Sequence, residues 1–161
     1  MSIEKPGAGA GRKEPIKLDS AARHLLEECR MVLPGIQALF GFQLIAVFSD
    51  GFSQKLPRGG QILHYAAIVL VAVAIALVMA PAAIHRQTSQ REVSERFIWL
   101  SSRLVLASMA PLSLGLCLEV YLIGVVVLES HAIGAVTAAA LFVIFMILWI
   151  WVPRREREKQ G

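Results

Sequence analysis

One carboxylate lies inside a long apolar stretch of this chain, Glu119 within Leu104–Leu128. A charge is costly to place in hydrocarbon, so an ionisable side chain in such a stretch is a candidate functional group. Glu119 could exchange a proton or bind a cation. The alternative, which the sequence favours, is a carboxylic acid that bonds to a neighbouring helix or extends to the membrane surface. His64 is expected on the same side of the membrane, but the sequence leaves open whether the two side chains meet.

Two amide side chains, Gln37 and Gln43, lie in the first apolar stretch. Six residues separate them, so they face different sides of a helix with ~3.6 residues per turn. One is expected to bond within the chain and the other to a second copy or a partner. Contacts of this kind between membrane helices are worth ~1 kcal/mol or less.

A second group of polar residues is expected at one end of the helices. Glu27 or Glu28 and Arg103 are predicted at similar depth, where an ion pair would fix the arrangement of helices. The full candidate cluster at the cytoplasmic end contains Glu27, Glu28, Arg30, His85, Arg86 and Arg103.

The elements that must position these side chains are four long apolar stretches, Met31–Ser49, Ile62–Ile84, Leu104–Leu128 and Ala132–Val152. Each has the ~17–25 residues that a helix needs to cross a bilayer. The chain is 56% hydrophobic, and its apolar residues occur in blocks rather than at amphipathic spacing. We therefore predict an all-α integral membrane protein, a four-helix bundle. Ala72, Ala76 and Ala80 repeat at every fourth position, which predicts close packing inside that bundle.

The flanking segments are polar. Residues 1–18 are expected to form a disordered tail, residues 19–152 the transmembrane domain and residues 153–161 a basic tail. Ala21–Met31 is expected to be a short amphipathic helix that leads into the first span and bends at Pro34. Pro81 is expected to mark the frayed end of the second span.

The distribution of basic residues predicts the orientation. The N-terminal segment, the second loop and the C-terminal tail hold thirteen of the 16 Lys and Arg residues, and the first loop holds two. Basic residues concentrate on the cytoplasmic side of membrane proteins, so both termini are expected in the cytoplasm. The net charge of +4 is explained by this bias and by attraction to anionic lipid, and no nucleic-acid partner is expected.

Enzymatic and cofactor chemistry is not expected. The four histidines (His24, His64, His85 and His131) fall near span ends, and none has a second ligand at the spacing of a metal motif. The sequence also shows no Gly-rich phosphate loop and no nucleophile–base arrangement. We therefore expect no enzyme activity, no cofactor and no metal.

One motif resembles a known family. The acidic Glu28 and Arg30 precede Leu33-Pro34-Gly35, and Gln37, Leu39 and Phe40 follow. This pattern is similar to the opening of a family of short bacterial membrane proteins catalogued only as a domain of unknown function. The resemblance continues at Ala80-Pro81-Ala82, His85-Arg86 and Arg103-Leu104, and covers about residues 24–152. It implies four spans in a bacterial inner membrane, but no activity, substrate or cofactor.

Two functions remain open at this point. The favoured one is a non-enzymatic membrane protein that binds a membrane partner or has a structural role, based on small size, few polar residues in the spans and charged tails. The alternative is a small oligomeric, proton-coupled transporter or channel that uses Glu119. The expected partners are the lipid bilayer and either a second membrane protein or further copies of this chain.

Overall fold

The computed structural model describes residues 10–87 and 95–158. Four of its helices are long and apolar enough to cross a membrane, which confirms the predicted spans. The first three lie in α1 (Ala10–Val47), α3 (Arg58–Gln87) and α4 (Glu95–Leu128). The fourth is the continuous helix His131–Arg155, which begins with α5 (His131–Met146). A short helix α2 (Phe52–Lys55) lies between α1 and α3, and α5 continues through a π-helical turn η1 (Ile147–Trp151) into α6 (Val152–Glu158).

The helices extend beyond the apolar stretches. α1 already begins at Ala10, so Ala21–Met31 forms part of one helix that continues into the first span. α3 runs through Pro81 to Gln87, so the expected frayed end at Pro81 is wrong. Proline is tolerated there because Pro81 is buried against neighbouring helices, as is common in membrane proteins. Residues 1–9, 88–94 and 159–161 of the expected tails and second loop lie outside the described residues.

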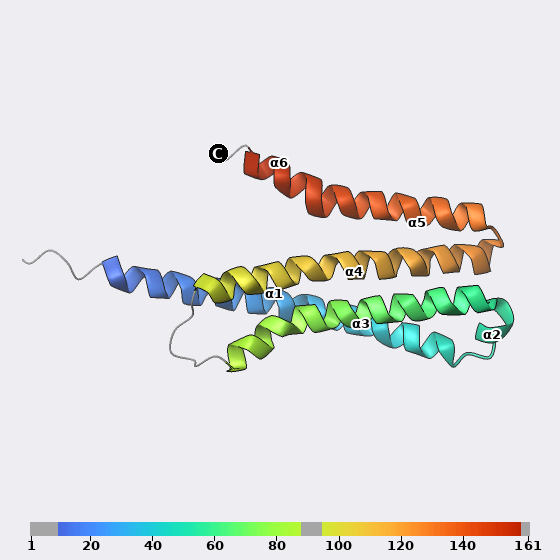
Figure 1. Ribbon diagram of the computed structural model, residues 1–161, viewed down its shortest axis with the longest axis horizontal. Coiled ribbons are helices and arrows are strands. Elements are labelled where there is room, and N and C mark those ends of the chain that lie inside the picture. The colour runs from blue at the N-terminus through green and yellow to red at the C-terminus, as the bar shows by residue number, and fades with distance from the viewer. Residues whose placement is uncertain (1–9, 88–94, 159–161) are drawn as a thin grey trace, which may run out of the picture.

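The helices run antiparallel, so the described ends of the chain lie at the same end of the bundle (Figure 1). We call this the terminal end; it contains the helix ends at Ala10, Gln87, Glu95 and Glu158. The loop end contains the helix ends at Val47, Arg58, Leu128 and His131.

α1, α3 and α4 form a three-helix body. Its core contains Cys29 and Ile36 of α1 together with Val71 and Val78 of α3. The buried stripe of α3 has spacings of four, three and four residues, which keep one face toward its neighbours; it consists of Ala67, Val71, Ala74 and Val78. The packing predicted for the alanine stripe is therefore wrong for Ala76, which is exposed. The core is occupied instead by valines of the adjacent face of α3.

α4 is the central helix, and small residues let its neighbours approach. Ser101, Ser108 and Gly115 repeat every seven residues and are all buried. A Cβ atom added at Gly115 would lie 3.0 Å from Val71 Cγ2 and 3.3 Å from the Ala67 carbonyl oxygen of α3. The α3–α4 contact therefore depends on close backbone approach, as is typical of membrane helices.

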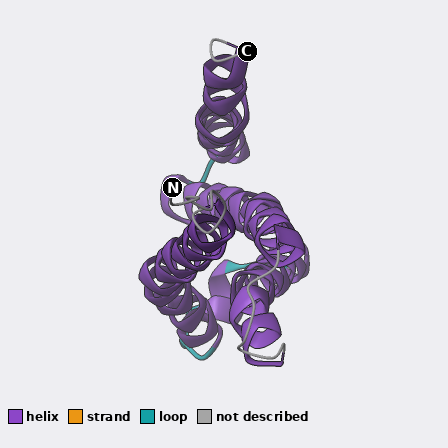
Figure 2. Ribbon diagram, turned by 90° about the vertical axis from the view of Figure 1, so that its left-hand side faces the viewer, coloured by secondary structure: helices purple, strands orange, loops and turns teal. Residues whose placement is uncertain are grey.

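α5 packs differently, because α4 is its main neighbour in the body and the two helices diverge toward the terminal end (Figure 1). Figure 2 shows α5 and α6 projecting away from the three-helix body. Only Gly134 is buried among the residues of α5. A Cβ atom at Gly124 of α4 would lie 2.6 Å from Gly134 Cα, and one at Gly134 would lie 2.7 Å from the Tyr121 carbonyl oxygen. This glycine contact, near the loop end, fixes the α4–α5 hairpin.

We predict that Gly124→Ala destabilises the protein, because the new methyl group would displace the backbone of α5. Overpacking of this kind costs about 1–3 kcal/mol. Gly41→Ala is the control, since nothing lies within 4 Å of a Cβ atom there, and replacing a helical glycine by alanine gains about 0.5–1 kcal/mol. Unfolding by SDS titration in mixed micelles measures both. Equal effects of the two substitutions would contradict the contact.

Candidate functional site

The described residues bring three polar side chains together inside the body, one from each of α1, α3 and α4. They are Gln43, His64 and Glu119, which we call the buried triad. On a rise of ~1.5 Å per residue they lie about 6, 9 and 14 Å below the loop end of their helices. Glu119 therefore lies nearer the loop end of α4 than its terminal end.

His64 makes the connection between the other two residues. Its Nδ1 atom lies 3.0 Å from Glu119 Oε1 and 3.2 Å from Glu119 Oε2. Its Nε2 atom lies 3.0 Å from the backbone carbonyl oxygen of Gln43. The Gln43 side chain completes the triad, because its Nε2 group donates a hydrogen bond of 2.9 Å to Glu119 Oε1.

The triad is shielded from the surroundings. Only 6% of the His64 side chain and 14% of the Glu119 side chain are exposed. The Phe52 ring of α2 packs against the imidazole, with 5.2 Å between the ring centroids and a tilt of 59°. α2 therefore covers the triad from the loop end. A charge pair in such an environment is screened far less than one at a surface.

The hydrogen bond to the Gln43 carbonyl determines where protons lie. A carbonyl oxygen can only accept, so His64 Nε2 carries a hydrogen. His64 Nδ1 then has two arrangements with Glu119. It donates to an ionised carboxylate, or it accepts from a protonated carboxyl group. One proton thus has two positions, and the His64–Glu119 pair has zero net charge in both.

One buried acceptor is left over. Gln43 Oε1 has no hydrogen-bond partner among the described residues, although only 4% of Gln43 is exposed. The Gln43 Nε2 group can donate to Glu119 in both states, because a carboxyl group that gives its one proton to His64 Nδ1 still has acceptor lone pairs. Gln43 is therefore suited to both states of the pair.

The structure places the other sequence-predicted residues apart from the triad. Gln37 is exposed on α1. In the candidate cytoplasmic-end cluster, the guanidinium of Arg103 lies over the Trp99 ring at 4.8 Å, and the His85 ring contacts Phe97 at 5.6 Å. Among the described residues, no ion pair joins any two of its members, which are Glu27, Glu28, Arg30, His85, Arg86 and Arg103. Glu27 instead lies 3.9 Å from His24.

The sequence places His64 on the same side of the membrane as Glu119 but leaves open whether they meet, so His64 is not among the candidate site residues. A usable signal is present, because Gln43, His64 and Glu119 all lie within about 14 Å of the loop end on three successive spans. Side chains of hydrogen-bonding type at matching depths are the ones that can meet in a bundle. The described residues contain no group of three His, Cys, Asp or Glu side chains that could hold a metal ion.

The triad predicts strong coupling between His64 and Glu119. Replacing either one by leucine leaves the other buried without its partner, which costs about 3–5 kcal/mol for a buried ion pair. The double replacement should cost less than the sum of the two, by about 1 kcal/mol or more. SDS-titration unfolding of the four proteins measures this coupling. Additive effects would show that the two side chains do not interact.

Comparisons with known proteins agree with the resemblance seen in the sequence. A family model described as a family of unknown function, DUF6328, matches residues 13–153. No curated protein and no solved structure matches the chain. The matched region includes the first three spans, the fourth span up to residue 153, and every residue of the buried triad.

Proposed function

We propose a function for this chain, which belongs to the family of unknown function DUF6328. The protein is a non-enzymatic protein of the bacterial inner membrane that binds a membrane-protein partner through α5. Both termini are proposed to face the cytoplasm, in line with the positive charge at the terminal end. The observation that carries the proposal is the packing of α5, which has a single buried residue.

The exposed side of α5 is suited to contact with another helix. Val136 and Val143 are 68% and 53% exposed, and with Ala140 between them they form a stripe of small and β-branched residues. Such stripes allow close helix approach in a bilayer. α5 packs against α4 on one side only, so a partner helix along this stripe would cover its exposed side.

The buried triad supports a structural role within this function. Both carboxylate oxygens of Glu119 and both ring nitrogens of His64 are already engaged, so no free nucleophile remains among these groups. A triad of this kind holds α1, α3 and α4 in register. The body then provides a rigid support from which α5 projects.

We predict that a photo-crosslinking amino acid at Val143 traps a partner and that the same amino acid at Val32 does not. The two valines are matched, because they are 53% and 52% exposed on α5 and α1, respectively. Crosslinking in intact cells, followed by mass spectrometry, should give one discrete protein adduct from Val143. The proposal is rejected if both positions give the same adducts or if Val143 gives none.

A second candidate function is proton-coupled transport by an oligomer of this chain. The observation that favours it is the pairing of Glu119 with His64, in which one proton has two positions. Transport would require the triad to open to each side in turn, with the proton bound in one state and released in the other. Coupled proton carriers in membranes commonly use carboxylate and histidine chains of this type.

For this second candidate we predict that Glu119→Gln abolishes proton flux driven by a pH gradient, because glutamine has no proton to release. The flux is measured in proteoliposomes containing a pH-sensitive dye, with valinomycin and potassium to prevent a membrane potential. Glu129→Gln is the control, since Glu129 is exposed in the loop after α4. A flux that survives Glu119→Gln, or no flux from the unmodified protein, rejects the transport role.

A further inference from the structure

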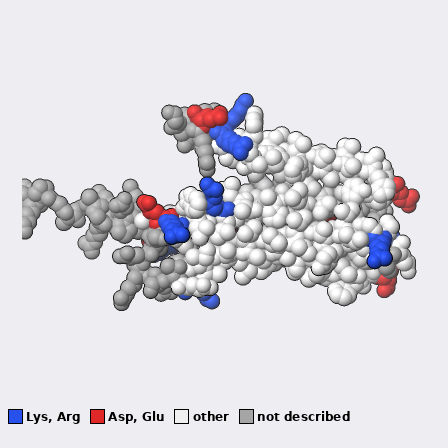
Figure 3. All heavy atoms as spheres, in the orientation of Figure 1, with Lys and Arg blue, Asp and Glu red and all other residues white. Residues whose placement is uncertain are grey.

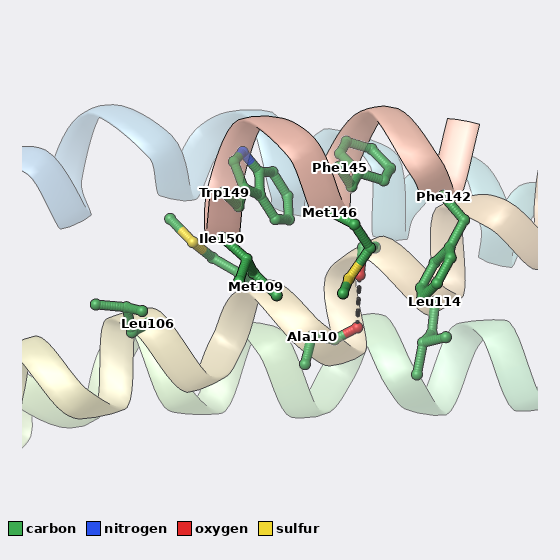
Figure 4. A pocket seen from close by; sticks show the side chains of 10 residues that line it. Leu106, Met109, Ala110, Leu114, Phe142, Phe145, Met146, Trp149 and Ile150 are labelled. Atoms are coloured by element: carbon green, nitrogen blue, oxygen red, sulfur yellow. Dashed lines mark hydrogen bonds between the residues drawn. The ribbon is translucent and has the colours of Figure 1, made fainter. Parts of the chain in front are cut away.

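An apolar cleft lies between α4 and the helix formed by α5 and η1, toward the terminal end. It has a volume of about 250 Å³. Figure 4 shows that Phe142 and Met146 of α5 point across it toward α4. Ser113 is the one lining residue with a hydroxyl group, and its Oγ donates to the Ala110 carbonyl oxygen at 2.9 Å. The cleft therefore presents almost no free hydrogen-bonding group to an occupant.

The cleft continues along the helices. A second cavity of about 480 Å³ shares Leu114 and Phe142 with it and extends to Tyr121. From Leu106 to Tyr121 the two together follow α4 for about 22 Å, on a rise of ~1.5 Å per residue. One leaflet of a bilayer has a hydrocarbon thickness of about 15 Å. The groove is therefore long enough to hold the whole length of one lipid acyl chain.

The size of the cleft favours an extended chain over a helix as its occupant. The lining residues span about 12 Å along each helix, from Leu106 to Leu114 and from Phe142 to Ile150. A volume of about 250 Å³ over this length is narrow, because a helix has a diameter of ~10 Å. An extended hydrocarbon chain suits this space better than a second copy of the chain.

Two basic residues follow the cleft residues toward the terminal end. Arg103 is one turn beyond Leu106 on α4, and Arg154 is one turn beyond Ile150 on α6, so both are at the terminal end. Figure 3 shows Lys and Arg side chains over α4 and over α6. Arg103 and Arg154 are exposed, and among the described residues neither forms an ion pair. Arg103 also contacts Trp99, an aromatic residue typical of the membrane interface.

We propose that this cleft binds one anionic phospholipid from the leaflet at the terminal end. One acyl chain lies in the α4–α5 cleft, and the phosphate lies between Arg103 and Arg154. Basic pockets between membrane helices are known to hold anionic headgroups in this way. The π-helical turn contributes, because the extra residue in its wider turn shifts the facing of Trp149 and Ile150, both of which line the cleft. The partner proposed above uses Val136, Ala140 and Val143, none of which lines the cleft, so either proposal can fail alone.

The test is native mass spectrometry of the intact chain in mild detergent with an equimolar mixture of dioleoyl phosphatidylglycerol and dioleoyl phosphatidylcholine. We expect one retained phosphatidylglycerol per chain. Arg103→Gln and Arg154→Gln should each weaken retention about fivefold, from the contribution of one basic residue near an anionic headgroup. Arg23→Gln is the charge control, since Arg23 is exposed at the same end on α1 and pairs with Asp19.

The acyl-chain part of the site has its own pair of variants. Ala110→Phe fills the cleft and should abolish retention without changing any charge. Ala76→Phe is its control, because Ala76 is exposed on α3, away from the cleft residues. Circular dichroism and gel filtration verify that each variant is folded.

Three results would overturn the proposal. They are equal retention of both lipids, retention that is unaffected by Ala110→Phe, and a dimer of the chain that carries no lipid.

Discussion

A carboxyl group inside a bilayer must find hydrogen-bond partners in the protein, because hydrocarbon provides none. In this chain Glu119 of α4 obtains them from Gln43 of α1 and His64 of α3. The consequence extends beyond the site. Sliding or rotating any of the three helices would separate at least one of these pairs, so the triad specifies the register of the body. The apolar core alone would specify it weakly, since lipid and protein are about equally favourable to an apolar side chain.

The position of α4 explains why the protein has a compact part and a projecting part. One face of α4 has small residues, among them Gly115, which let α3 approach closely. Another face has Gly124, where Gly134 of α5 approaches. Beyond that point, toward the terminal end, the facing residues are large, including Met109, Phe145 and Trp149. α5 therefore leaves α4 as it runs toward Glu158, and the divergence creates both the cleft and the exposed outer stripe.

Some of the polar residues in the triad can be predicted from the sequence, and others cannot. Glu119 and Gln43 were recognised as candidates because each interrupts an apolar stretch, and both are in the triad. His64 was assigned to a span end, where a histidine is unremarkable, and its role became visible only when α3 was placed beside α4. The expected pairing of Glu27 or Glu28 with Arg103 depended on equal depth alone. Depth leaves the rotation of each helix undetermined, and in the structure Arg103 lies over Trp99 of its own helix.

The sequence by itself determined the class of this protein, its four spans and the family to which it belongs. Span length and block hydrophobicity are properties of each segment alone, so each segment's ability to cross a bilayer follows from its own sequence. The tertiary structure alone decided which faces of the helices meet. It selected Val71 and Val78 rather than Ala76 for the core, joined His64 to Glu119, and left Gly134 as the single buried residue of α5. These outcomes depend on the fit of side chains between helices, a relation between segments that no single segment contains.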